Sequence, residues 1–431
     1  MSFSEHIGEQ AERIARYRNK QGVAILRERI DAAQVQAQAW DHLAESGVAP
    51  SLRGLSVAVK ACFDVYGWVT TAGSRVLEDQ PPASADAPLV AALSRCGAVV
   101  TTQTNMTEFA FGALGLNPHF GTPVTPLDPS GQRIAGGSTS GGAVAVSLGL
   151  ADLALGSDTS GSIRIPAAFC GVTGFKPSHG RYSDGGMIYL SPSFDVPGFI
   201  ARDVETLLRV DRALVPDELS TPDAIDLRGR RFLVPPAFAL EYADSSVRAA
   251  FQATLETLKN RGAQVVEEDW PELASYGEMA VAGGIIIAEA FTWHRAHLQT
   301  QAHLYDPRIG PRIASGEQVK ASSYLDAHQS LARHALAFHQ RLTPFDALLT
   351  PTVPILPPTL AELDDDTTYY KTNRLTFRLT EVANRIDAPS VSLPVDPVQP
   401  IGICLTGHRG HDRALLHLSH AVQAALHPSL S

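Results

Sequence analysis

The sequence predicts an α/β fold, in which helices alternate with the strands of a mainly parallel sheet. Short apolar runs bounded by turn residues, such as 55–59, are typical of buried strands. Longer stretches place apolar residues at helical spacing, and the two patterns alternate along the 431 residues. A chain of this length, of which 44% is hydrophobic and 19% charged, can bury a sizeable core.

The first half of the chain begins with helical spacing over 4–45, which predicts a helical segment. The turn-rich segment GVAPSLRG separates it from a strand over 55–59, which ends at Lys60. A helix over 87–96, a short strand over 98–101 and a long Gly/Pro/Ser/Thr-rich loop over 112–142 follow. Residues 142–150 are apolar all round, which predicts a buried helix, and 153–155 resemble a short buried strand.

The second half starts a new unit with a strand over 232–234. From Ser245 a helix carries apolar residues on one face, and Gly262 ends it before a strand over 264–266. Residues 270–345 are predicted to be mostly helical. Late strands are expected at 348–350, 390–393 and 401–406, with a closing helix near 412–426.

Charge and cysteine content exclude several classes of protein. The net charge of -10 argues against a nucleic-acid-binding surface. The four cysteines are far apart and form no CxxC pair, so reduced thiols in a cytoplasm are expected rather than a disulfide framework or a zinc site. The polar first ten residues lack a signal-peptide apolar region, and no run approaches ~18 uninterrupted apolar residues. We therefore expect a cytoplasmic protein with no membrane partner.

Two loops of small residues lie close together in the sequence, GGSTSGGAVAV over 136–146 and GSDTSGSIRIPA over 156–167. Because neither carries bulk, the backbone can approach a ligand closely. The first loop leads directly into the predicted buried helix, whose N–H groups would face whatever occupies the loop. A phosphate-binding loop would need GxxxxGK[ST], which is absent, and a surface turn rarely leads straight into an apolar helix.

The segment 136–177 closely resembles the amidase signature family. It follows the family pattern GGSS(G/S)G, an apolar helix, and then G(S/T)DTGGSIRxPAxxCGxxGxKP. The resemblance continues in the family's order through LSVAVKACFDV (55–65), ANRIDAPSVSLPV (383–395) and PIGICLTG (400–407). It implies a single α/β domain over 1–431, with a large central mixed β-sheet covered by helices on both faces. Within it, the signature core would span about 55–205 and a variable, pocket-shaping region about 205–345.

The same resemblance implies a Ser-cisSer-Lys triad. Ser162 matches the nucleophile, whose hydroxyl needs a base, and neither loop contains a histidine. Ser138 matches the bridging serine, which in the family follows a cis peptide bond. Lys60 matches the base: if its amine is buried at the end of the apolar run, its lowered pKa would let it accept a proton through Ser138. The alternatives are a turn serine at 162 and a strand-end lysine that reaches water.

An oxyanion hole is implied at the backbone N–H groups of Thr159, Ser160, Gly161 and Ser162. The sequence departs from the family pattern without removing a triad member, at Ala61, Thr125, Gly142 and Ser160. These departures leave open how the triad is packed. Three further residues match family positions and are interpreted as structural ion pairs that support the loops: Asp158, Arg164 and Asp195.

No cofactor and no metal are expected. The histidines of the predicted helical region lack the carboxylate or cysteine of a tight metal motif, so we interpret them as a solvated helix face. They are His294, His297 and His303, and the same interpretation covers His408, His411, His417 and His420. Cys170 is interpreted as a small core residue rather than a nucleophile.

The resemblance implies an amidase that hydrolyses a small or aryl carboxamide to a carboxylate and ammonia or an amine. GFKPSHG (174–180) and SFDVPGFIARD (193–203) are most similar to short indole-acetamide hydrolase-like enzymes. One alternative is a ureide amidase resembling allophanate hydrolase, which would need a basic group such as Arg308 or Arg312 to hold a substrate carboxylate. The others are one component of a tRNA-dependent amidotransferase and an inactive amidase-like scaffold. The expected partner is a small-molecule amide, and a homodimer stays open.

Overall fold

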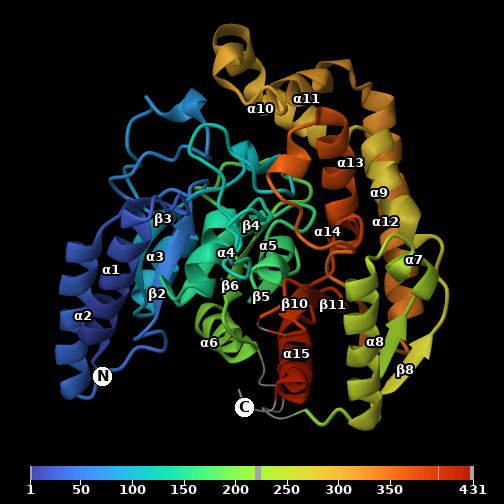
Figure 1. Cartoon of the computed structure of the whole chain (residues 1–431), viewed down its shortest axis with the longest axis horizontal. Coiled ribbons are helices and arrows are strands. Elements are labelled where there is room, and N and C mark those ends of the chain that lie inside the picture. Colours follow the sequence, from blue (N-terminus) through green and yellow to red (C-terminus); the bar gives the residue numbers. More distant parts are fainter. Residues whose placement is uncertain (1, 219–224, 397, 428–431) are drawn as a thin grey trace.

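The computed structural model describes residues 2–218, 225–396 and 398–427, and within these ranges one sheet contains all eleven strands (Figure 1). Their order across the sheet is β1-β3-β2-β4-β6-β5-β10-β11-β9-β7-β8. The strands are β1 (Ile25–Glu28), β2 (Ser56–Lys60), β3 (Val99–Thr104), β4 (Leu153–Asp158), β5 (Thr173–Lys176), β6 (Val196–Ala201), β7 (Arg231–Val234), β8 (Gln264–Glu267), β9 (Ala347–Pro351), β10 (Ser390–Pro394) and β11 (Gly402–Thr406). The sheet therefore joins segments from both halves of the chain.

The α-helices surround this sheet (Figure 1). They are α1 (Phe3–Asn19), α2 (Ile30–Glu45), α3 (Pro88–Arg95), α4 (Ser140–Ser147), α5 (Arg164–Phe169), α6 (Val204–Leu214), α7 (Pro236–Leu240), α8 (Ser245–Asn260), α9 (Leu273–Ala282), α10 (Ile285–Gln301), α11 (Gly310–Ala314), α12 (Ala321–Leu342), α13 (Asp366–Phe377), α14 (Glu381–Arg385) and α15 (Asp412–Leu426). Short 3₁₀ turns lie at Arg75–Leu77, Glu108–Ala110, Ala302–Leu304, Ser315–Gln318 and Ala361–Leu363.

Alternate residues of the central strands pack into two separate cores. On β2, Val57 and Val59 join an apolar cluster that includes Leu207 of α6 and Leu416 of α15. Ala58, between them, joins the cluster that contains the apolar residues of α4. Because successive side chains of a strand point to opposite faces, the two clusters lie on opposite faces of the sheet. The sheet is thus covered by helices on both faces, as the resemblance implies.

The sheet is mixed. Within the described ranges, six of its ten strand pairings are antiparallel: β1–β3, β4–β6, β5–β6, β5–β10, β10–β11 and β9–β11. The other four, β2–β3, β2–β4, β7–β8 and β7–β9, are parallel. The prediction of a mainly parallel sheet, drawn from strand–helix alternation, is therefore wrong. The sequence pattern did not include β5 and β6, which place antiparallel strands in the middle of the sheet.

Most predicted elements occur where the sequence places them, with one clear exception near the N-terminus. α8 begins at Ser245, and α15 spans the predicted 412–426. The predicted helical segment 4–45 is instead two helices separated by β1, which pairs antiparallel with β3. Strand pairing with a distant segment overrides local helical spacing there.

One stretch, Leu273–Leu304, is long and apolar enough to cross a membrane by length and composition alone. It is not one continuous helix, because α9 ends before Gly283 and Gly284, and Gly284 takes a left-handed φ of 63° before α10 begins. Of its most apolar window, 44% is buried inside the protein. Length and composition are therefore weak grounds for a membrane span here.

The topology brings the two small-residue loops together. β2 and β4 are parallel neighbours with Val59 opposite Leu155, so their carboxyl ends lie at the same edge of the sheet. Lys60 is the last residue of β2, and the second loop begins at the end of β4. The first loop lies beside the second, since Thr139 N donates a hydrogen bond to Ser162 O at 3.1 Å.

Candidate active site

Lys60 is fully buried and its amine contacts three oxygen atoms. Nζ lies 2.8 Å from Ser138 Oγ, 2.9 Å from Ser157 Oγ and 3.4 Å from Ser157 O. Throughout the described chain, no ion pair includes Lys60. Burial lowers the pKa of Lys60 below its ordinary value, because the charged form loses its hydration. The amine therefore does not reach water, unlike the strand-end lysine considered as an alternative.

Ser138 lies in a loop whose backbone is closely surrounded. The peptide bond between Gly137 and Ser138 is cis, as the family resemblance implies. Gly137 N donates to Ala113 O at 2.7 Å, and Ser138 O accepts from Thr107 N at 3.2 Å. A Cβ at position 137 would lie 2.7 Å from Thr107 Oγ1, so only glycine fits beside the serine.

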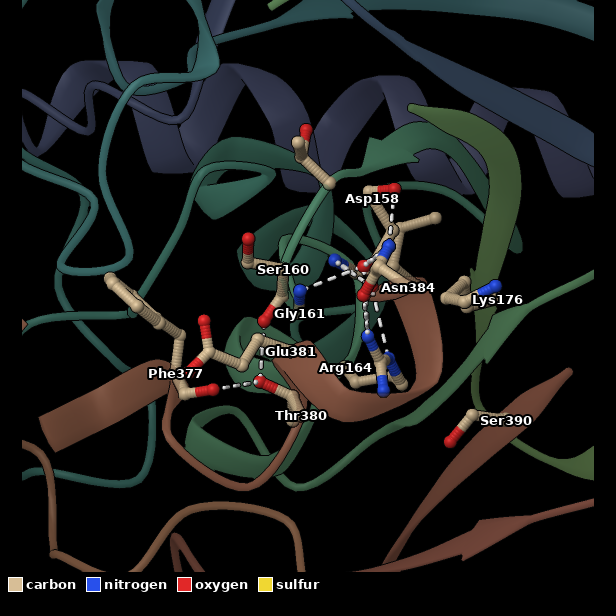
Figure 2. Close-up of polar contacts among 12 residues, drawn as sticks. Asp158, Ser160, Gly161, Arg164, Lys176, Phe377, Thr380, Glu381, Asn384 and Ser390 are labelled. Carbon is tan, nitrogen blue, oxygen red and sulfur yellow. Dashed lines mark hydrogen bonds and ion pairs between the residues drawn. The ribbon is translucent and has the colours of Figure 1, made fainter. Parts of the chain in front are cut away.

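The loop that carries Ser162 is held by a buried ion pair between Asp158 and Arg164 (Figure 2). Asp158 Oδ1 accepts from Gly161 N at 2.7 Å and from Arg164 Nη2 at 2.9 Å. Burial opposes ionisation of Asp158, but the charge and hydrogen bonds of Arg164 outweigh it and lower the pKa of the carboxyl to about 2. Asn384 donates to Asp158 O at 2.9 Å and so ties α14 to the same loop.

Asp195 supports the loop in a different way from the ion pair we expected. Its carboxylate accepts hydrogen bonds from the Thr159 hydroxyl and from the backbone of Leu190 and Ser191, at 2.7 and 3.0 Å for the latter two. No cation pairs with Asp195 among the described residues, and burial raises its pKa to about 6. The prediction of a structural ion pair is therefore confirmed for Asp158 and Arg164 and wrong for Asp195.

The predicted oxyanion donors are not equivalent. Gly161 N is occupied, because it donates to Asp158 Oδ1. In the part of the chain that the structure describes, Ser160 N and Ser162 N donate to no backbone acceptor. Gly161 itself has a φ of 129°, and a Cβ there would overlap the Thr380 side chain. Its contribution is thus the shape of the turn, and Thr159 N, like Ser160 N and Ser162 N, has no acceptor among the described residues.

A cavity of about 300 Å³ opens beside Ser162. Thr159, Ser160 and Ser162 form one part of its wall, and apolar side chains form most of the rest, namely Ala110, Phe111, Ala113, Ile165, Leu190, Ala280, Val281, Ile286, Ile287 and Phe377. Gly112, Gly284 and five polar or charged side chains complete the lining: Arg312, Ser315, Asn373, Glu381 and Arg385. The predicted serine nucleophile therefore borders a mostly apolar pocket.

The residues singled out from the sequence do not all meet in one place. Arg308 pairs with Asp366 at 2.7 Å and lines a different cavity, whereas Arg312 lines the cavity beside Ser162. Ser138 contacts Lys60, but no hydrogen bond joins the Ser138 and Ser162 side chains in the described structure. Within the described ranges, no three His, Cys, Asp or Glu side chains could hold a metal ion.

The interpretation of the histidines as a solvated helix face is wrong for two of them. His294 is completely buried, and its Nδ1 lies 2.8 Å from the Tyr305 hydroxyl. His417 is buried in α15. Cys170 is buried, as expected, and burial raises the pKa of its thiol to about 12.

Sequence reasoning gave no role to four residues that shape the site, namely Ser157, Thr380, Glu381 and Arg385. Ser157 supplies two of the three oxygen contacts of Lys60. Thr380 Oγ1 donates to Ser160 O at 2.6 Å, and Arg385 Nη2 donates to Ser160 Oγ at 2.8 Å (Figure 2 shows the Thr380 contact). Arg385 belongs to the ANRIDAPSVSLPV segment, so the resemblance pointed to this region without indicating its function.

Comparison with known proteins identifies the family of this chain. The family model described as Amidase matches residues 6–416. The 2-amino-5-chloromuconic acid deaminase of Comamonas testosteroni is 34% identical over 91% of this chain and 86% of its own length. A glutamyl-tRNA(Gln) amidotransferase subunit from Koribacter versatilis (strain Ellin345) is 31% identical over 92% of this chain and 89% of its own length. A solved structure described as an amidase superposes with a TM-score of 0.88 at 30% identity, covering 98% of this chain and 96% of the other.

These matches extend over nearly the whole chain and include proteins at least 30% identical to it. The fold that they share is the mixed α/β architecture described above. The chain therefore belongs to the amidase signature family and is a hydrolase that acts on the carbon–nitrogen bonds of linear amides.

Proposed function

We propose that this enzyme hydrolyses a small or aryl carboxamide through an acyl-enzyme, with Ser162 as nucleophile, Ser138 as bridging hydroxyl and Lys60 as base. The observation that carries the proposal is the 2.8 Å contact between the buried Lys60 Nζ and Ser138 Oγ. The cavity beside Ser162 supports it, because an amide bound there would meet the Ser162 hydroxyl. No cofactor or metal takes part in the proposed reaction.

The three contacts of Lys60 suit a neutral amine. A neutral amine has two N–H donors and one lone pair, so it can donate to both Ser157 oxygens and accept from the Ser138 hydroxyl. Burial without a paired carboxylate favours this uncharged form, since an uncompensated ammonium in the interior is costly. Ser138 can then receive the proton of Ser162 while it passes its own to Lys60.

The reaction begins when Ser162 Oγ attacks the carbonyl carbon of the amide. The proton of Ser162 moves to Ser138 Oγ, the proton of Ser138 moves to Lys60 Nζ, and the carbonyl oxygen becomes an oxyanion held by the N–H groups of Ser160 and Ser162. As the C–N bond breaks, the leaving nitrogen takes a proton back through Ser138 and departs as ammonia or an amine. Water then attacks the acyl-enzyme by the same route and releases the carboxylate.

The lining of the cavity supports a small or aryl acyl group. Phe111 and Phe377 offer two aromatic side chains, and about 300 Å³ is near the lower end of ligand pockets. We also propose that the variable region of about 205–345 shapes this pocket. Ala280, Ile287 and Arg312, which come from α9, α10 and α11, support that assignment because all three line the cavity.

Two of the alternatives predict different behaviour in solution. The relative from Koribacter versatilis is one component of an amidotransferase, so an enzyme of that kind would need partner chains for its activity. An inactive scaffold would bind without turnover. The proposed enzyme, by contrast, acts on a small-molecule amide in the cytoplasm, as a single chain or a homodimer.

The purified enzyme should hydrolyse members of a panel of small, aryl and ureide amides, and Ser162→Ala should abolish turnover. A fluorophosphonate should label Ser162, as mass spectrometry of the peptides would show. Ser193→Ala is a matched control, because Ser193 is a loop serine that contacts Glu289 and should leave turnover largely intact. Loss of activity with the label on another residue would defeat the assignment. A ureide preference would favour the allophanate-type alternative.

A further inference from the structure

Three charged side chains line the cavity beside Ser162, and their charges do not balance. They are Glu381, Arg385 and Arg312. Glu381 is already paired: its Oε1 lies 2.7 Å from Arg374 Nη1, and its Oε2 lies 3.4 Å from Arg385 Nη2. Two arginines therefore share one carboxylate, and Arg312 is an additional cation. The cavity is positive although the whole chain carries a net charge of -10.

Several contacts hold the Arg385 guanidinium in place, and one of its donor nitrogens has no partner among the described residues. Its Nη1 donates to Thr159 O at 3.1 Å, and its Nη2 donates to Ser160 Oγ at 2.8 Å. The Phe194 ring lies 4.3 Å from the guanidinium carbon and fixes its plane. Nε is buried and has no hydrogen-bond partner among the described residues. A guanidinium stays charged, so an anionic acceptor in the cavity that Arg385 lines would be stabilised by its charge.

Arg312 is a second cation on the same cavity and has no carboxylate partner in the described part of the chain. It is half-buried, stacks 4.2 Å from the centre of the Phe111 ring, and donates from Nη1 to Phe111 O at 3.2 Å. The remaining donors of its guanidinium are free for a ligand. Arg308, four residues earlier in the turn before α11, shows the contrast, because Asp366 pairs with it and it lines a different cavity.

We propose that Arg385 and Arg312 bind a carboxylate of the substrate, so that the preferred substrates are carboxamides that also carry an anionic carboxyl group. This inference rests on the proposed function, because it places the amide end of the substrate at Ser162. An ionised oxygen is the strongest acceptor for a guanidinium, and it would offset the unbalanced charge of the cavity. Because Arg385 contacts Thr159 and Ser160, which neighbour Ser162, the carboxylate lies close to the scissile amide. A cavity of about 300 Å³ holds on the order of ten water-sized groups, which limits the substrate to a small molecule.

The test uses monoamides of short diacids as probes, namely malonamate, succinamate and glutaramate, each compared with its uncharged diamide. In the wild-type enzyme, kcat/KM for the best monoamide should exceed kcat/KM for the corresponding diamide by about tenfold or more. This is the factor expected for one charge-assisted hydrogen bond. Arg312→Met and Arg385→Lys should remove most of this preference. Arg308→Met, the matched control, should keep it. Equal kcat/KM for the acid and its diamide, or an unchanged preference in both variants, would overturn the proposal.

A binding measurement separates this proposal from the proposed mechanism. Succinate and glutarate should raise the Tm of the wild-type protein and of Arg308→Met, whereas the diamides should not. The increase should shrink in Arg312→Met, which contacts no part of the Ser162 loop and should fold normally. If Ser162 proves not to be the nucleophile, this Tm response still decides whether the cavity binds carboxylates. A Tm that no diacid changes would contradict the carboxylate site even if the amidase mechanism is correct.

Discussion

Asp158 and Asp195 are both buried and both hold the loop that ends at Ser162, yet they do so with opposite electrostatics. Asp158 pairs with Arg164, which lowers the pKa of the carboxyl to about 2. Asp195 has only hydrogen bonds, and burial raises its pKa to about 6. Arg164 follows Asp158 within a few residues and is a visible partner, whereas the surroundings of Asp195 depend on the tertiary fold.

Lys60 is the residue for which the sequence and the structure make the sharpest chemical prediction. Since burial lowers the pKa of Lys60 and only the neutral amine can accept a proton, kcat/KM should rise with pH through the folded-state pKa and then level off. Lys60→Ala should lower turnover by several orders of magnitude. Lys60→Arg should fail as well, because arginine cannot release its proton near neutrality. A pH profile of kcat/KM for the wild type and the two variants checks this.

The matched control for that profile is Lys176→Arg, at a second buried lysine that donates to Pro177 O at 2.6 Å and takes no part in the proposed proton path. Its pH profile should keep the wild-type shape even if the protein is less stable. A Lys60→Arg enzyme with near-normal turnover would show that Lys60 is only a structural cation.

At the scale of elements, the site depends on how α14 meets the loop after β4. Asn384 and Arg385 of α14, with Thr380 just before it, contact Asp158, Thr159 and Ser160 across more than 200 residues of sequence (Figure 2). The small-residue loop could be recognised from its own sequence because its chemistry is local. The helix that holds it could not be assigned a role, since that role exists only when β10 and β5 pair and bring α14 beside the loop.

Gly161 should be the least replaceable residue of this junction. An alanine there would adopt a left-handed φ of 129°, which costs about 1–2 kcal/mol, and its Cβ would also overlap Thr380. Gly161→Ala should therefore lower both turnover and the free energy of unfolding, as urea titration and kinetics would measure. Gly180→Ala separates the two effects, because Gly180 has a φ of 79° and no atom lies within 4 Å of the place that an added Cβ would take. If both substitutions lower turnover and the free energy of unfolding by the same amount, close packing against Thr380 has no part in the result.

At the scale of the whole molecule, the sequence predicted the fold class but not the order of the strands. The parallel neighbours β2 and β4 follow from strand–helix alternation, and this pair brings Lys60 to the Ser157–Ser162 loop. The central antiparallel strands do not follow, because β6 lies between β4 and β5 through pairings that no local pattern records. The charged residues of the cavity wall come from α11 and α14, which are far apart in the sequence, so their meeting at one cavity was equally hidden from the sequence.

The molecule as a whole should work without a metal ion. In the proposed reaction a buried amine is the base, and backbone N–H groups stabilise the oxyanion. Neither role therefore needs a metal ion. Prolonged dialysis against EDTA or 1,10-phenanthroline should therefore leave kcat/KM within about twofold of the untreated enzyme, a change of less than about 0.5 kcal/mol in activation free energy. Added zinc or manganese should not raise it. A loss of activity that either metal restores would place a metal in the reaction and would reopen the role of the histidines, beginning with the buried His294, whose Nε2 has no partner among the described residues.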